Sequence, residues 1–171
     1  SVAKFFLRNT AIERQGGFIE QKPVYVKQIP IPNVNDELRN VLTEKVDLLL
    51  KLKLEKQELN KQALDVLTAE YKIAKVTQKL EHFLRLGWNE FVEELEKQKV
   101  RLDLTQKDKL NMWFRSKQKT AINLNESIEK LAREIDTWVY KLYDLNESEI
   151  KLIERENNNL AIDSRMHLLS A

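Results

Sequence analysis

The sequence predicts a mainly α-helical protein, organised around a long antiparallel coiled-coil helical hairpin. First, charged residues make up 33% of the 171 residues, and the chain has only three Gly and three Pro. This composition favours long, solvated helices. Second, apolar residues recur at heptad spacing in two stretches that are far apart in the chain. Third, β-like patterning is confined to residues 1–34.

Residues 1–34 are expected to form a short β remnant of a larger domain. Apolar residues concentrate at 4–7 and 18–29, which predicts two short strands. Gly16-Gly17 provides a turn between them, and Pro30 and Pro32 end the second strand. A sheet this small leaves exposed strand edges, so we expect homodimer formation or domain swapping.

A long helix is predicted for residues 35–86. Asn33 or Asn35 is a suitable N-cap, and Asp36 and Glu37 suit the positive end of the helix dipole. Two heptad series follow: Leu52, Leu59, Val66, Ile73 and Leu80, and Leu42, Leu49, Lys56 and Ala63. Such a helix spans roughly 75 Å and cannot bury this stripe against itself, so it requires a partner helix.

The partner is predicted in residues 124–156, as a return helix followed by a short docking helix. Its apolar seam, with spacings of four and three, consists of Leu124, Ile128, Leu131, Ile135, Trp138 and Leu142. An antiparallel hairpin would bury both stripes. Asn146 and Glu149 resemble a capping box that starts the docking helix. Residues 157–171 are weakly patterned and are expected to form a mobile tail.

Residues 87–123, between the two long helices, are expected to form an inserted helix pair. Gly87 breaks the first long helix. The first inserted helix carries an apolar face of Trp88, Phe91, Val92 and Leu95. For the second, Thr105 is a suitable N-cap with Asp108 in the box position, and Leu110, Trp113 and Phe114 are expected in the core.

Composition and motifs favour a protein without catalytic activity. The net charge is +2. Cysteine is absent, so thiolate chemistry is excluded and a reducing, cytoplasmic location is expected. No apolar run approaches the ~18 residues of a membrane span, so no membrane partner is expected. The isolated His82 and His167 give no metal-ligand spacing. No glycine-rich cofactor loop is present, and neither a catalytic residue nor a cofactor is expected in this fragment.

Two segments, QGGFIEQKPVYVKQIPIP at 15–32 and EIDTWVYKLYDLNESEIKLIE at 134–154, resemble the C-terminal part of a TaqI-like target recognition domain. Such specificity domains occur in type IIG restriction–modification enzymes and DNA adenine methyltransferases, and they are related to type I specificity subunits. Residues 88–114 are similar to a helical insertion of the type IIG branch. Where the family has Tyr-Gly-Leu, this chain has Tyr143-Asp144-Leu145. That glycine is a left-handed C-cap, a conformation that Asp tolerates better than most residues.

The resemblance implies a non-catalytic DNA-specificity fragment that positions the recognition domain against a methyltransferase core. In such a parent protein the core uses S-adenosylmethionine, the nuclease uses Mg²⁺, and the partner is double-stranded DNA. The candidate DNA-binding residues lie in the basic first segment and are Arg8, Arg14, Gln15, Lys22, Lys27 and Gln28. The four cations among them could bind DNA phosphates, and the two glutamines could form hydrogen bonds with adenine edges. A solvated strand edge would explain the cations equally well.

The main alternative is a stand-alone coiled-coil adaptor that binds another protein and does not contact DNA. A third interpretation, a half-length type I specificity subunit, would require two copies of the chain or two repeats within it, and the sequence contains no internal repeat.

Overall fold

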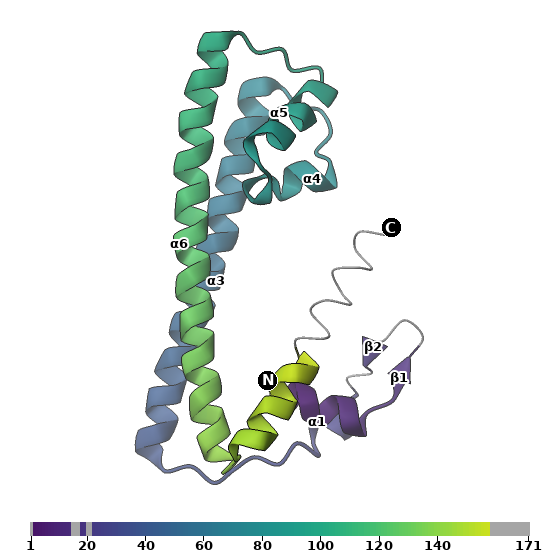
Figure 1. Cartoon of the computed structure of the whole chain (residues 1–171), viewed down its shortest axis with the longest axis vertical. Helices are drawn as coiled ribbons and strands as arrows, with labels where there is room; N and C mark the ends of the chain where they lie inside the picture. Colours follow the sequence, from purple (N-terminus) through teal and green to yellow (C-terminus); the bar gives the residue numbers. More distant parts are fainter. Residues whose placement is uncertain (1, 15–17, 20–21, 158–171) are drawn as a thin grey trace. The chain divides into compact units, whose positions relative to one another are not determined.

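The computed structural model describes residues 2–14, 18–19 and 22–157, and these residues are mainly helical (Figure 1). The elements are α1 (Val2–Thr10), β1 (Glu13–Arg14), β2 (Phe18–Ile19), α2 (Pro23–Val26), α3 (Asp36–Tyr71), α4 (Gln78–Glu81), the 3₁₀ helix η1 (Phe83–Arg85), α5 (Trp88–Lys97) and α6 (Leu104–Leu142). A further helical stretch covers 147–157. The chain divides into a terminal unit, Ser1–Thr43 with Arg133–Ala171, and a central unit, Glu44–Ala132.

The core of the central unit combines α3, α4, η1, α5 and α6. Its buried members are Ala63, Leu67, Leu80, Phe83, Leu84, Phe91, Leu95, Val100, Leu110 and Phe114. Phe91 and Phe114 stack with ring centroids 4.6 Å apart, and Phe83 stacks on Phe91 at 5.2 Å. The predicted core positions of the insertion are therefore confirmed except for Val92, which is half-buried outside this cluster, since Trp88 and Trp113 also pack against it.

The first long helix ends earlier than predicted. Helix α3 stops at Tyr71, whereas the sequence predicted a helix to residue 86. Lys72 adopts a left-handed φ of 50°, and the Ile73 N–H donates to the Thr68 carbonyl at 3.1 Å. This is a helix C-cap built without glycine, so no local stop signal was visible in the sequence. Thr77 then caps the short helix α4 by accepting a hydrogen bond from the Leu80 N–H.

The heptad register of α3 changes after Ala63. Leu52 and Leu59 are half-buried and Ala63 is buried, as predicted. Val66 is 56% exposed, however, while Leu67 is only 1% exposed. After Ala63 the next buried position, Leu67, comes four residues later, where the heptad series predicted three. Such a change of spacing is called a stutter, and it keeps the apolar stripe on one face of a straight helix. Placing Val66 in the stripe was therefore wrong.

Helix α6 runs without interruption from Leu104 to Leu142. The second inserted helix and the return helix, predicted as separate elements meeting at residues 123 and 124, are one helix. Its cap also differs from the prediction. The Gln106 N–H donates to Asp103 Oδ1 at 2.8 Å, and the Asp103 N–H donates to Gln106 Oε1 at 2.9 Å. Asp103 and Gln106 thus form the reciprocal capping box that was assigned to Thr105 and Asp108.

The predicted seam lies on the inner face of α6. Leu124 and Leu131 are buried, and Ile128 and Ile135 are half-buried. The same spacing continues back through Ala121 and Phe114 to Leu110, and these residues pack in the central core. Residues 44–71 of α3 and 104–132 of α6 lie side by side in the central unit (Figure 1).

The terminal unit contains far less strand than predicted. Residues 4–7 belong to α1, because Val2 and Phe5 have helical spacing and pack with Tyr140 and Ile153. Among the described residues of 18–29, strand is confined to Phe18–Ile19, which pairs antiparallel with Glu13–Arg14. Pro23–Val26 is helical, with proline in the first turn where its missing N–H costs nothing. The predicted turn at Gly16-Gly17 lies outside the described residues.

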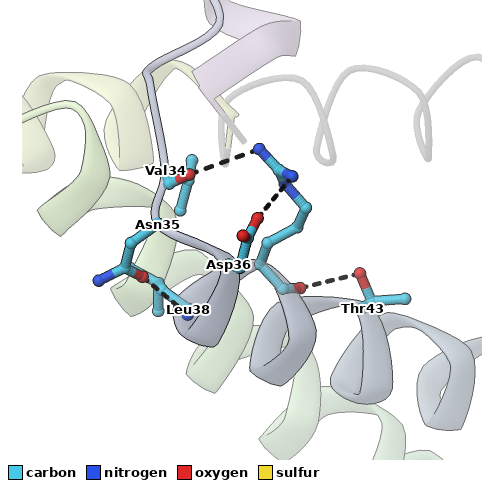
Figure 2. Close-up of polar contacts among 6 residues, drawn as sticks. Val34, Asn35, Asp36, Leu38 and Thr43 are labelled. Atoms are coloured by element: carbon cyan, nitrogen blue, oxygen red, sulfur yellow. Dashed lines mark hydrogen bonds and ion pairs between the residues drawn. The ribbon is translucent and has the colours of Figure 1, made fainter.

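The caps of the terminal unit follow the sequence closely. Asn35 Oδ1 accepts from the Leu38 N–H at 2.9 Å, which selects Asn35 over Asn33 as the cap of α3 (Figure 2). Asp36 pairs with Arg39 at 2.9 Å in the first turn. The capping box predicted at the start of the short docking helix is confirmed, since the Asn146 N–H donates to Glu149 Oε2 at 2.8 Å.

Candidate functional site

The structure places five of the six candidate DNA contacts, and they lie on or beside different elements. Lys22 is exposed and immediately precedes α2, while Lys27 caps its C-terminal end and Gln28 follows in an exposed turn. These three lie on or beside one short helix, not along a strand edge as predicted. Arg8 is half-buried in the last turn of α1. Arg14 belongs to β1, and Gln15 lies outside the described residues.

The two segments that carry the family resemblance meet in the terminal unit. The Tyr143 hydroxyl donates to the Pro30 carbonyl at 2.6 Å, although the residues are 113 positions apart. Beside this bond lies a hollow of about 360 Å³ lined mainly by apolar side chains, among them Phe5, Ile29 and Leu145. A phenol hydrogen bond to a proline carbonyl fixes the loop before α3 against the end of α6.

Asp144 adopts the left-handed conformation expected at the glycine position of the resembling family. Its φ is 51°. The Leu145 N–H donates to the Tyr140 carbonyl at 3.1 Å, and the Asp144 N–H donates to the Lys141 carbonyl at 3.1 Å. These two bonds form a Schellman motif, and the accompanying apolar contact is present because Leu145 packs on the cluster containing Tyr140.

The central unit carries a groove of about 480 Å³ between α3, η1 and α6, which we call the basic groove. Its basic side chains are Lys53 and Lys56 of α3, His82, and Arg85 of η1. The lining contains no Asp or Glu. In the described part of the chain, Lys53 and Arg85 form no ion pair. This groove therefore presents positive charge with no carboxylate in its lining.

Amide side chains hold the walls of the basic groove in place. Gln118 Nε2 donates to the Leu86 carbonyl at 3.0 Å and lies 3.4 Å from the Leu84 carbonyl, tying η1 to α6. Asn60 Nδ2 donates to the Glu81 carbonyl at 2.8 Å, tying the end of α4 to α3. Lys56 Nζ donates to Asn125 Oδ1, which joins the two long helices directly.

Sequence reasoning did not identify this groove. Its residues come from three elements, and each is an ordinary polar residue of a helix surface when taken alone. One signal was present: Lys56 interrupts an apolar heptad series, and a lysine on the packing face of a helix needs a polar partner. The series Lys53, Lys56, Gln57 and Asn60 has the spacing of one helix face.

Glu94 is the buried carboxylate of the central unit, with 4% of its surface exposed. Lys97 Nζ donates to Glu94 Oε1 at 2.6 Å, and the Thr77 hydroxyl donates to Oε2 at 3.3 Å. The hydrogen bond from Lys97 is the largest influence on Glu94 and lowers its pKa against the opposing effect of burial. The same bond raises the pKa of Lys97. The bond from Thr77, the N-cap of α4, joins that helix to α5.

The described residues contain no group of three or more His, Cys, Asp or Glu side chains arranged to hold a metal ion. His82 lines the basic groove, and His167 lies outside the described part of the chain. None of the described helices is both long and apolar enough to cross a membrane.

Residues 35–139 match a family described as a domain of unknown function, DUF8810. The chain belongs to the DUF8810 family. The match begins at Asn35, the cap of α3, and ends within α6. It therefore includes the whole central unit with its basic groove, while α1, β1, β2 and α2 fall outside it. Comparison with curated proteins gives no significant match, and comparison with solved structures gives none either.

Proposed function

We propose that this DUF8810 chain is a non-catalytic DNA-specificity part of a restriction–modification protein, in which it positions a TaqI-like target recognition domain against a methyltransferase core. The observation that carries this proposal is the bond from Tyr143 to the Pro30 carbonyl. It joins the two distant segments whose sequences resemble that family. If residues 15–32 and 134–154 act as one unit, as in the family they resemble, they are expected to be in contact. The hydrogen bond from Tyr143 to Pro30 is such a contact.

The conformation of Asp144 supports the same proposal. The resembling family has glycine here, which adopts left-handed backbone without strain. Asp144 has a φ of 51°, so the backbone keeps the glycine conformation although the side chain has changed. This agreement depends on backbone geometry and is independent of the Tyr143 contact.

The helical body serves as a spacer in this proposal. Helices α3 and α6 form an antiparallel coiled-coil hairpin whose seam runs from Leu110 to Leu142 on α6. The polar contact of Lys56 with Asn125 fixes the register of the two helices, because shifting the pairing would leave the lysine among apolar side chains.

The proposed partners are double-stranded DNA and the methyltransferase core of the parent protein. Arg8, Arg14, Lys22 and Lys27 would contact phosphates, and Gln15 and Gln28 would contact base edges. S-adenosylmethionine and Mg²⁺ belong to the parent's catalytic parts, and this chain supplies no catalytic residue. A cytoplasmic location and self-association through the short strands belong to the same proposal.

The experiment is fluorescence anisotropy of labelled duplex DNA with the chain, joined to any sequence that precedes it in its gene. The double variant Lys22→Gln, Lys27→Gln is compared with the wild type and with the control Arg155→Gln, an exposed cation of the terminal unit. Two lost phosphate contacts flatten the salt dependence, so the slope of log K against log salt changes by about 1.8. An unchanged slope in the double variant, or an equal change in the control, contradicts the proposal.

The second candidate function is a protein-binding adaptor. It is favoured by an apolar row on α3, where Val46, Leu50 and Leu54 are 40%, 53% and 62% exposed. The four-residue spacing places them on one side of the helix. This adaptor would show no salt-dependent DNA binding in the experiment above.

A further inference from the structure

We propose that the basic groove of the central unit binds the phosphate group of a nucleotide. The proposal concerns residues 44–132 and uses none of the candidate DNA contacts near the N-terminus, so it stands or falls separately from the proposed function. Its starting point is the combination of a hollow of about 480 Å³, several cations and no lining carboxylate. Ligand pockets for small molecules have volumes of about 300–1,000 Å³, and the groove lies within that range.

The charges of the groove favour an anion. Lys53 and Lys56 project from α3 and Arg85 from η1, so cations reach the groove from two elements. Surface lysines and arginines commonly pair with carboxylates, yet Lys53 and Arg85 have no ion pair in the described part of the chain. Because a concave surface with one sign of charge concentrates counter-ions, a phosphate group is the ligand chemistry that this lining fits best.

Lys56 is already oriented for such a contact. Its ammonium donates one hydrogen bond to Asn125 Oδ1 and is half-buried between the long helices. An ammonium group has three donors, so two remain for a ligand. The position of Arg85 is supported by the bonds of Gln118 to the carbonyls of Leu84 and Leu86, on either side of it in the chain. These cations therefore lie on a wall that is fixed before any ligand binds.

The floor of the groove selects a nucleotide over free phosphate. It contains Leu84, Ala121 and Ile122, of which Ile122 is 50% exposed. An inorganic phosphate ion would leave this apolar surface in water, whereas a flat base would cover it. Gln57 lines the same groove and can both donate and accept hydrogen bonds at a base edge.

The test is isothermal titration of the full chain at low salt with three probes: adenosine monophosphate, inorganic phosphate and a short duplex DNA. Adenosine monophosphate is expected to bind more tightly than inorganic phosphate. Lys56→Gln and Arg85→Gln should each weaken that binding about tenfold or more, since each removes a charge-assisted hydrogen bond. The control Lys109→Gln, an exposed lysine of α6 outside the groove, should leave it unchanged.

The duplex arm identifies the source of the phosphate. If duplex DNA binds, adenosine monophosphate does not, and both groove variants weaken the DNA complex, the groove holds a strand phosphate and the proposal of a nucleotide site is overturned. It is also overturned if no probe binds, if the control weakens binding as much as the groove variants, or if inorganic phosphate binds as tightly as adenosine monophosphate. Because Lys56 and Arg85 lie on separate elements, a folding defect in one variant would not explain weaker binding by both.

Discussion

The register shift in α3 predicts opposite effects for two neighbouring substitutions. Leu67 is 1% exposed and packs in the core of the central unit, so Leu67→Ala removes buried methyl groups and leaves a cavity. Substitutions of this kind cost about 2–5 kcal/mol of unfolding free energy. Val66 is 56% exposed, so Val66→Ala loses little burial. Alanine is the better helix former by up to about 0.7 kcal/mol, and the change should be neutral or slightly stabilising.

Urea unfolding of the two variants, followed by circular dichroism at the helix band and by tryptophan fluorescence, measures this difference. Trp88 and Trp113 pack against the core that contains Leu67, so their fluorescence reports on the central unit. Continuation of the heptad series would place Val66 inside and Leu67 outside. If Val66→Ala lowers the unfolding free energy more than Leu67→Ala does, the stutter after Ala63 is wrong.

Three further substitutions test local features. Glu94→Gln should lower stability at pH 7 and have a smaller effect at pH 3, because the pKa of Glu94 is depressed by Lys97. A depressed folded-state pKa gives stability above the ordinary carboxyl pKa that is lost as pH falls through the lower value, so urea midpoints at both pH values check it. Asp144→Gly should raise the unfolding free energy by about 0.5–1 kcal/mol by relieving the φ of 51°, and an unchanged or lower melting temperature would refute this. Asn35→Ala should cost about 1 kcal/mol through loss of the bond to Leu38, with Asn33→Ala as the matched control that should cost nothing.

The long helices could be predicted from the sequence, but their ends could be predicted only where a polar cap signals them. Asn35 and Asn146 carry side chains that accept backbone hydrogen bonds, and both were identified from their residue types. The ends at Lys72 and Lys99 depend on left-handed lysines, with φ of 50° and 65°. These caps are closed by the following apolar residue packing in the core, a tertiary effect that local sequence does not contain.

The N-terminal strands were mispredicted for a related reason. A short apolar run such as residues 4–7 fits either a strand or a buried helix turn, and its period cannot be determined over four residues. Residues 4–7 are helical because Val2 and Phe5, at helical spacing, pack against Tyr140 and Ile153, which are far away in the chain. The basic groove was missed because its residues converge only after folding. Lys56 gave the one local signal, as a lysine on an otherwise apolar face.

The salt dependence of duplex DNA binding tests the proposed DNA-specificity role most directly. Binding constants are measured by anisotropy over a series of salt concentrations for the chain joined to any sequence that precedes it in its gene. Four phosphate contacts, from Arg8, Arg14, Lys22 and Lys27, predict a slope of log K against log salt of about −3.6. A slope near zero, or no binding at low salt, would contradict the role in DNA recognition and favour the protein-binding adaptor.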